Sequence, residues 1–225
     1  MSSVMCQLLG AVLISTAVGG LSAGAQEPGS DRRARAIADE ARALIYFHSP
    51  RDIRGTELLT ISFRDGEEEQ WLYLPALRRA KRISASGRSS PFMGSEFAYE
   101  DLVPMYPGQF EYAYVGEDVL DGAVAHVIER APQYEGSGYR KQRVWIDLGE
   151  YRVLRVDSWD HRERLLKTLR LTGYVEYAAG QWRPADAVMT NHLTEAETRL
   201  RWFEYRFMTG LRESDLSRAA LGRVR

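Results

Sequence analysis

The sequence predicts a mainly β domain of the α+β class, built from a strongly curved antiparallel sheet and one long N-terminal helix. Two observations support this fold class. Short apolar segments separated by turn residues follow one another from Ile53 almost to the end of the chain, and short turns join strands that pair as antiparallel neighbours. Only one segment before them has the apolar spacing of a long helix.

Residues 1–25 differ from the rest of the chain. Leu8–Leu21 is apolar and uncharged, and the tripeptide AGA before Gln26 matches an A-x-A cleavage pattern. These features are typical of a secretory signal peptide, whose apolar core is too short to span a membrane. The positive charge usual at the start of a signal is missing from Met1–Gln7. We expect export, removal of residues 1–25, and a single domain over residues 26–225.

Composition narrows the classes of function. Cys6 is the only cysteine and lies inside the predicted signal, so the mature chain would have no disulfide, no cysteine nucleophile and no zinc site made of cysteines. With 30 basic and 31 acidic side chains the formal net charge is −1. No basic excess favours nucleic acid or an anionic membrane surface as a partner.

The long helix is expected over Asp31–Phe47. Ala34, Ile37 and Ala41 are among the residues that recur there at three- and four-residue spacings. The segment ends before Pro50, because the residue that precedes a proline disfavours the helical region. Its narrow apolar stripe is typical of a helix that lies on a sheet.

The strands are expected one after another along the chain. Asp65-Gly66 and Asp121-Gly122 mark hairpin turns, and a last helical turn or two is expected at Ser214–Leu221. The expected strands are 56–63, 70–74, 80–84, 110–115, 123–130, 139–147, 152–160, 164–177, 183–192 and 198–208. So many strands with so little helix to cover them predict a sheet that curls into a barrel or half-barrel, or exposes an apolar concave face.

A stretch of about 25 residues between Ser84 and Gly108 has no clear strand pattern, and loops of that length in a compact domain are usually functional or disordered. Its aromatic content argues against disorder. The segment PFMGSEFAYEDL within it, residues 91–102, allows three interpretations: a buried structural loop, an active-site loop carrying Glu96, Glu100 and Asp101, or an apolar flap over a ligand. Adjacent Glu100 and Asp101 are more simply a turn or helix-capping pair.

Catalytic and metal-binding patterns are weak. His48, His126, His161 and His192 are scattered, without the spacing of metal ligands. No G-x-S-x-G elbow or Gly-rich phosphate loop is present, and Asp157 and Asp160 are simply explained as turn formers. The sequence therefore predicts no metal site, no cofactor and no enzymatic activity.

Two consecutive motifs resemble a known family. WLYLPALRRAKRIS followed by FMGSEFAYEDL is similar to the outer-membrane lipoprotein-sorting-protein-like family of bacteria, a LolA/LolB-type group. The matching residues are Trp71, Tyr73, Pro75, Arg79, Arg82 and Ile83, then Phe92, Gly94, Ser95, Glu96, Phe97, Tyr99, Glu100 and Asp101. Ala98 departs from the family, which more often has Ser or Thr there. The order of the later strands fits as well, so the resemblance covers nearly the whole mature chain.

The resemblance implies an open half-barrel, covered by the long N-terminal helix and by short helices and loops. It implies a periplasmic carrier or chaperone that shelters the acyl chains of lipids or lipoproteins in an apolar cavity. An inner-membrane transporter is a further implied partner, and we expect a monomer. Two alternatives stay open: a non-carrying structural or regulatory subunit of an RND-type or other envelope transporter, and an enzyme that uses Glu96, Glu100 or Asp101.

A lipid-binding surface is expected from the apolar residues of the loop and strands. Arg79 and Arg82, with Lys81 between them, are candidates to meet a headgroup, although a charged run of this kind also protects an edge strand from unwanted pairing. The expected lipid-binding residues are Trp71, Leu72, Arg79, Arg82, Phe92, Met93, Phe97, Tyr99, Met105, Tyr106, Tyr112, Tyr114, Phe203 and Tyr205.

Overall fold

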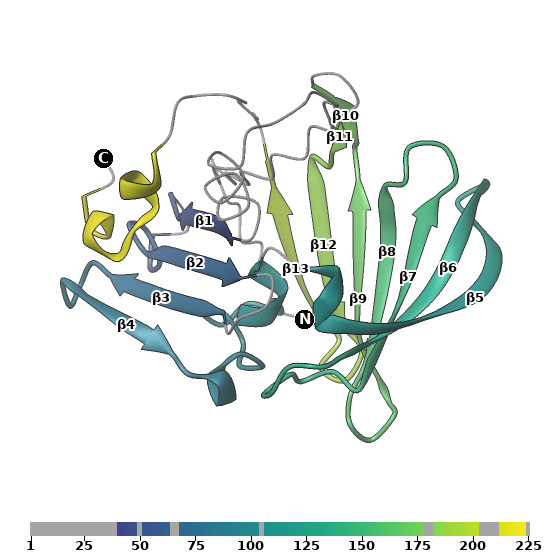
Figure 1. The fold of residues 1–225 in the computed structure, drawn as a ribbon, viewed down its shortest axis with the longest axis horizontal. Helices are drawn as coiled ribbons and strands as arrows, with labels where there is room; N and C mark the ends of the chain where they lie inside the picture. Colours follow the sequence, from purple (N-terminus) through teal and green to yellow (C-terminus); the bar gives the residue numbers. More distant parts are fainter. Residues whose placement is uncertain are drawn as a thin grey trace, which may run out of the picture.

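The computed structural model describes residues 40–48, 51–63, 68–103, 106–177, 182–202 and 212–223. These residues form two main antiparallel sheets with short 3₁₀ helices between and beside them (Figure 1). The predicted signal peptide, the Asp65-Gly66 turn, Met105, Phe203 and Tyr205 lie outside the described ranges. Within those ranges, no helix has the length and apolar character needed to cross a membrane.

The smaller sheet comes first in the chain and has the strand order β1-β2-β3-β4. Its strands are β1 (Glu40–Tyr46), β2 (Glu57–Phe63), β3 (Glu69–Leu74) and β4 (Arg79–Ile83). Strand β4 is an edge strand that carries the basic run, and Arg79, Lys81 and Arg82 are all exposed. The basic run therefore lies on an exposed edge strand, as expected for charges that protect such a strand from unwanted pairing.

The expected helix over residues 31–47 is wrong for its second half, which is strand β1. Every residue of β1 pairs with β2, from Glu40 opposite Phe63 to Tyr46 opposite Glu57. Ala41, Ala43 and Ile45 alternate as buried residues, a strand period that the helical spacing had hidden. Pairing along a whole neighbouring strand outweighs the weak helix preference of seven residues. Residues 31–39 lie outside the described ranges.

The larger sheet has the strand order β13-β12-β9-β8-β7-β6-β5, a meander from which only the short β10–β11 pair departs. Its strands are β5 (Phe110–Leu120), β6 (Ala123–Pro132), β7 (Lys141–Asp147), β8 (Val153–Trp159), β9 (Leu165–Thr172), β12 (Asp186–Asn191) and β13 (Ala196–Arg201). The separate pair is β10 (Val175–Glu176) and β11 (Trp182–Arg183). The sheet is curved but not closed, because its described edge strands β5 and β13 do not pair with each other (Figure 1).

Local sequence explains the turns of this sheet. Asp121 and Gly122 both have positive φ, 53° and 82°, as the two central residues of a type I′ hairpin turn require. They connect β5 to β6, with Leu120 opposite Ala123, and confirm the predicted turn. Asp160 accepts the backbone N–H groups of Arg162 and Arg164 between β8 and β9, both at 2.9 Å.

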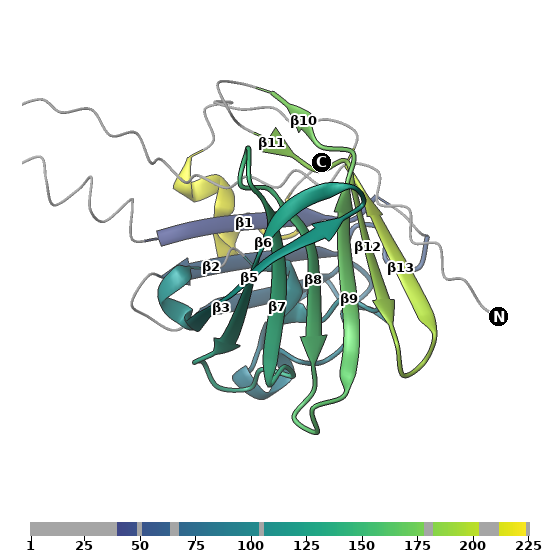
Figure 2. The same ribbon diagram turned by 90° about the vertical axis from the view of Figure 1, so that its right-hand side faces the viewer.

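The smaller sheet lies across one face of the larger sheet. In Figure 2 the larger sheet is in front, and the strands of the smaller sheet behind it cross its strands at a steep angle. The long segment between β4 and β5 contains the 3₁₀ helices η1 (Ala85–Gly87), η2 (Tyr99–Leu102) and η3 (Pro107–Gln109). We call Pro91–Leu102, which includes η2, the plug. The smaller sheet and the plug together cover the face of the larger sheet that the long helix was expected to cover.

The plug is a small folded unit in the main core. Its backbone closes on itself, with Phe92 N–H donating to the carbonyl of Phe97 at 2.7 Å. Phe92, Phe97 and Tyr99 are buried in one apolar cluster with residues of both sheets. The ring of Phe92 stacks on Phe47 with 4.8 Å between centroids. Of the three interpretations of this segment, the structure thus places its aromatic residues in a buried structural loop.

The C-terminal helices η4 (Glu213–Leu216) and η5 (Arg218–Ala220) cover the opposite face of the smaller sheet. Leu216 packs there with Leu44 and Leu59, and Trp71 is in contact with the same cluster. The Arg218 guanidinium lies 4.3 Å from the centre of the Trp71 ring. The expected helical turns at Ser214–Leu221 are therefore present, and they cover the surface of Trp71.

Candidate functional site

The inner face of the larger sheet, which is the face toward the smaller sheet, carries two adjoining rows of side chains. Residues that pair directly in antiparallel strands point to the same face, so the strand register defines each row. The apolar row runs from β13 to β5 through Thr198, Met189, Leu169, Val156, Val144, Ile128 and Tyr114. The polar row runs beside it through Ala196, Asn191, Lys167, Ser158, Gln142, Arg130 and Tyr112.

A cavity of about 140 Å³ lies against both rows. Its apolar wall is formed by Val144, Val153, Val156, Leu169, Leu171 and Met189. Its polar wall is formed by Glu100, Asp101, Arg130, Tyr134, Tyr139, Gln142 and Ser158. Pockets for drug-sized ligands usually measure roughly 300–1,000 Å³, so this cavity accepts only part of a molecule of that size.

Two carboxyl groups of the plug close the polar wall. Glu100 is buried and accepts three hydrogen bonds, from the Tyr134 hydroxyl at 3.0 Å, the Ser137 hydroxyl at 2.7 Å and the backbone N–H of Gly138 at 2.8 Å. Each of these donors belongs to the loop between β6 and β7. We call Glu100 with these three donors the clamp, because it fixes the plug to the larger sheet.

Asp101 has a similar structural role. It accepts the N–H of Ala98 at 2.7 Å, which caps η2, and the Tyr139 hydroxyl at 2.9 Å. Burial raises the pKa of Asp101 to about 6, and the nearby positive charge of Lys167 opposes part of that rise. Burial likewise raises the pKa of Tyr139. The oxygen atoms of both carboxyl groups accept hydrogen bonds from donors of the protein itself. This arrangement favours a role in anchoring the plug over a role in acid–base catalysis.

The polar row contributes two cations to the inner face. Lys167 is buried, with its ammonium 5.9 Å from the centre of the Tyr139 ring. Arg130 donates from Nε to Gln142 at 2.9 Å, and its guanidinium lies 4.6 Å from the ring centre of Phe110. Burial lowers the pKa of Arg130, although a guanidinium stays charged at any physiological pH.

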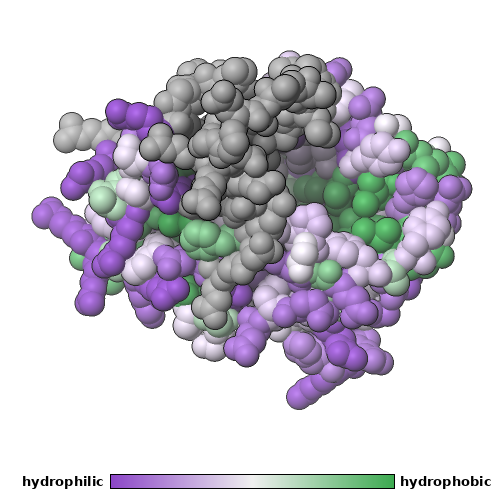
Figure 3. All heavy atoms as spheres, viewed as in Figure 1, coloured by the Kyte–Doolittle hydropathy of each residue, from purple (hydrophilic) through white to green (hydrophobic). Residues whose placement is uncertain are grey.

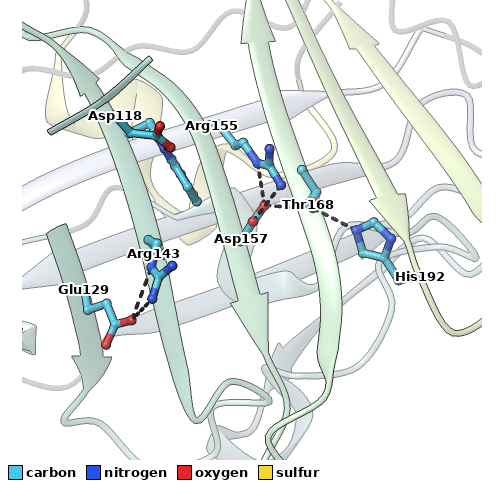
Figure 4. A network of polar contacts seen from close by, with 8 residues as sticks. Asp118, Glu129, Arg143, Arg155, Asp157, Thr168 and His192 are labelled. Atoms are coloured by element: carbon cyan, nitrogen blue, oxygen red, sulfur yellow. Dashed lines mark hydrogen bonds and ion pairs between the residues drawn. The ribbon is translucent and has the colours of Figure 1, made fainter. Parts of the chain in front are cut away.

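The outer face of the larger sheet carries a ladder of ion pairs and hydrogen bonds instead (Figure 4). Asp157 accepts hydrogen bonds from Nε and Nη2 of Arg155, at 2.8 and 2.7 Å, and from the Thr168 hydroxyl at 2.8 Å. His192 Nε2 lies 2.8 Å from the same hydroxyl oxygen. Asp157 thus lies within β8 and links strands, which corrects its interpretation as a turn former.

The outer face also has a groove of about 550 Å³, lined by Glu111, Glu129, Lys141, Trp159 and their neighbours. Glu129 in this groove is already paired, because its carboxylate accepts hydrogen bonds from Arg143 at 2.5 Å and from Lys141 at 3.2 Å. The described residues contain no group of His, Cys, Asp or Glu side chains that could hold a metal ion. The inner cavity, although smaller, is therefore the candidate site.

The structure separates the residues predicted to bind lipid. Leu72, Phe92, Phe97 and Tyr99 are buried in the main core, and Met93 packs against it. These side chains fill the space between the two sheets rather than line the cavity. The cavity wall includes none of the five.

The remaining predicted residues are distributed over several surfaces. Trp71 and Arg82 pair across β3 and β4 on the face of the smaller sheet that points away from the cavity, and Arg82 contacts Glu69 at 3.4 Å. Arg79 is exposed on β4, and Tyr106 is half-buried just before η3. Tyr112 and Tyr114 are on the inner face of β5, where both are exposed. Among the described residues of the predicted set, Tyr114 is the one that belongs to the apolar row.

Sequence reasoning missed the apolar wall, although a signal for it exists. Val144, Val156, Leu169 and Met189 alternate with neighbours inside predicted strands. In segments such as KQRVWID, however, both faces carry apolar residues, so the inner face is identified only by the pairing with adjacent strands.

Comparisons with known proteins agree with this fold. A family model described as an uncharacterized protein matches residues 39–223. A domain from Vibrio parahaemolyticus, described as an outer membrane lipoprotein-sorting protein domain, is 43% identical with a TM-score of 0.79, covering 81% of this chain and 78% of that chain. A DUF1329 family protein from Desulfovibrio piger is 28% identical with a TM-score of 0.77, covering 82% and 78%.

A LolA superfamily protein from Nitrosomonas europaea, 19% identical with a TM-score of 0.60 over 81% of each chain, shares the fold. No curated protein matches the sequence. The chain belongs to the family of the outer-membrane lipoprotein-sorting domain from Vibrio parahaemolyticus, as the paired motif in residues 71–102 predicted.

Proposed function

We propose that this protein is a periplasmic lipid- or lipoprotein-binding protein of the sorting type, which shelters acyl chains against the inner face of its larger sheet. The observation that carries the proposal is the cavity, in which an apolar wall of six side chains faces a polar wall closed by the clamp. An amphiphile fits this division, with its chain on the apolar row and its polar group beside Arg130.

The energetics of chain binding support the same interpretation. Each buried methylene contributes about 0.8 kcal/mol, so an apolar groove binds an acyl chain without any reacting group. The family relationship supports a carrier as well, because the Vibrio parahaemolyticus domain is described as lipoprotein-sorting. An inner-membrane transporter that delivers or receives the chain is part of this proposal.

The rival function is a non-carrying subunit of an envelope transporter, whose interior is filled by its own side chains. One observation favours it: Phe92, Phe97 and Tyr99 of the plug are buried in the core between the two sheets. The two functions differ in a measurable way, because only the carrier binds a chain at Val156.

Native mass spectrometry of protein isolated gently from the periplasm tests the proposal. We expect bound species with lipid masses in the wild type and their loss in Val156→Trp, which fills the cavity. Val188→Trp is the matched control, because it places the same side chain on the outer face of the same sheet, where Val188 pairs with Arg199. A wild type that carries no lipid under any isolation condition, or equal binding by both variants, would contradict the proposal.

A further inference from the structure

The apolar row continues past the cavity to an open edge of the larger sheet. Val156 and Val144 belong to the cavity wall. Register then places Ile128 of β6 opposite Val144, and Tyr114 of β5 opposite Ile128. Exposure rises along this path, since Val144 is 1% exposed, Ile128 is half-buried and Tyr114 is 64% exposed.

The path ends at a strand with one neighbour. β5 pairs only with β6 among the described strands, so nothing in that part of the chain continues the row beyond Tyr114. Figure 3 shows apolar surface extending from the hollow beside the grey atoms toward the side of the molecule where β5 to β8 lie. The apolar wall of the cavity ends at Val144 on β7. From there the row crosses two strand spacings of about 4.8 Å each to reach Tyr114 on β5, so it continues for about 10 Å beyond that wall.

Charges flank this path but do not block it. The polar row lies on one side, where Arg130 is held by Gln142 and stacked on Phe110. On the other side His126 is close to Tyr114, with 3.3 Å between its Nδ1 and the hydroxyl oxygen, and Glu117 lies 3.9 Å from the same nitrogen. A flexible apolar chain can follow the row between these groups, whereas a globular partner would also meet the charged and polar side chains on both sides of it.

We propose that the acyl-chain site extends beyond the cavity along this row, so that the end of the chain enters between Val156 and Val144 and the rest crosses Ile128 to leave over Tyr114. The proposal rests on the proposed function and makes it more specific, because it names a linear chain longer than the 140 Å³ cavity as the ligand. It also explains how a small cavity serves a long chain: part of the chain is buried and part lies on the open sheet.

Chain length is the experimental variable that separates the two parts of the site. Full burial of one methylene is worth about 0.8 kcal/mol, roughly a four-fold change in affinity. A methylene that lies on an open surface is covered on one side, so we expect roughly a two-fold gain for each one added beyond the cavity. The test uses saturated fatty acids of eight to eighteen carbons, a range chosen to exceed the cavity, and measures their Kd by calorimetry.

The decisive variant is Ile128→Thr combined with Tyr114→Thr, which keeps strand-forming residues while it removes apolar surface from the row. We expect short chains to bind this variant as they bind the wild type, and the gain for longer chains to be lost. The matched control is Leu77→Thr combined with Leu193→Thr, two exposed leucines on other turns, which should keep the full dependence on length. Circular dichroism and thermal unfolding verify that each variant is folded.

Three outcomes would overturn the inference. In the first, wild-type affinity stops rising once the cavity is full. In the second, the row variant and the control lose the long-chain gain equally. In the third, no chain of any length binds wild type, which also defeats the proposed function and so differs from the first two. A long-chain gain lost only in the row variant supports the extended site.

Discussion

The clamp on the plug leads to a quantitative prediction for Glu100→Gln. The Glu100 carboxylate accepts three hydrogen bonds, and all three partners are donors that point at it. A glutamine has one acceptor oxygen, and its amide group would face donors in place of the second oxygen. Glu100 is buried, so bulk water replaces little of what is lost.

The expected cost follows from these contacts. Hydrogen bonds to a charged group contribute about 1.5–3 kcal/mol each, and Glu100→Gln removes at least one while it weakens the others. We therefore expect the free energy of unfolding to fall by about 2–4 kcal/mol. Tyr134→Phe removes one donor and leaves the other two in place, so it should cost about 1 kcal/mol.

Urea denaturation followed by tryptophan fluorescence measures these differences, with the free energy in water obtained by linear extrapolation. Combining the two changes in a double-mutant cycle isolates the Glu100–Tyr134 coupling. A Glu100→Gln protein within 0.5 kcal/mol of wild type, a margin typical of surface changes, would refute the clamp as the plug's main anchor.

The remaining predictions concern the backbone, pH and the far face of the smaller sheet. Gly136→Ala should destabilise the protein by about 2–3 kcal/mol, because a Cβ there would overlap the carbonyl group of Ala85. The control is Gly149→Ala, where a Cβ meets open space and the free energy of unfolding from chemical denaturation should change little. Equal effects of the two substitutions would contradict this packing. The pKa of Asp101 is raised from 3.8 to about 6 on folding, so the folded state holds its proton more tightly and stability should fall as pH rises from about 4 to about 6. Denaturation at a series of pH values measures this fall, and in Asp101→Asn the free energy of unfolding should depend less on pH between about 4 and about 6. An unchanged pH dependence in this variant would contradict the role of Asp101. Trp71 is partly buried, so Trp71→Ala should cost about 1–3 kcal/mol while leaving fatty-acid affinity unchanged in calorimetry. A selective loss of affinity would support the prediction that Trp71 binds lipid.

The strand meander and its turns could be predicted because their signals are local. The pair Asp121-Gly122 specifies a two-residue hairpin by its backbone preferences alone. The resemblance in residues 71–102 identified the family, because it depends on residue identity and order rather than on contacts. The expected strand from 139 to 147 agrees with β7, Lys141–Asp147.

The cover of the larger sheet could not be predicted in the same way. Ala41 and Ile45 satisfy both a helical and a strand spacing, and the choice between them is made by pairing with β2, which is more than ten residues away in sequence. The aromatic residues of the plug were expected at a ligand because they are apolar and lie in an irregular segment. The same properties also suit residues of a hydrophobic core. Only the position of the two sheets around these side chains distinguishes a core position from a ligand-binding one.

The cavity itself depends on register. Val156 and Leu169 become neighbours only because β8 and β9 pair with that offset, and a one-residue slip would turn both to the outer face. Their apolar character was visible in the sequence, but their common surface was not. For this reason the described members of the predicted lipid-binding set do not belong to the cavity wall.

Photo-crosslinking of an acyl chain tests the central claim most directly. A long-chain fatty acid with a diazirine near its terminal methyl group is bound to the protein, irradiated, and located by peptide mass spectrometry. We expect the label at the inner-face residues Val144, Val156 and Leu169, and we expect excess unlabelled fatty acid to prevent the labelling. Labelling confined to the outer groove at Glu129 and Trp159, or spread without competition over the surface, would contradict a chain-binding cavity in this fold.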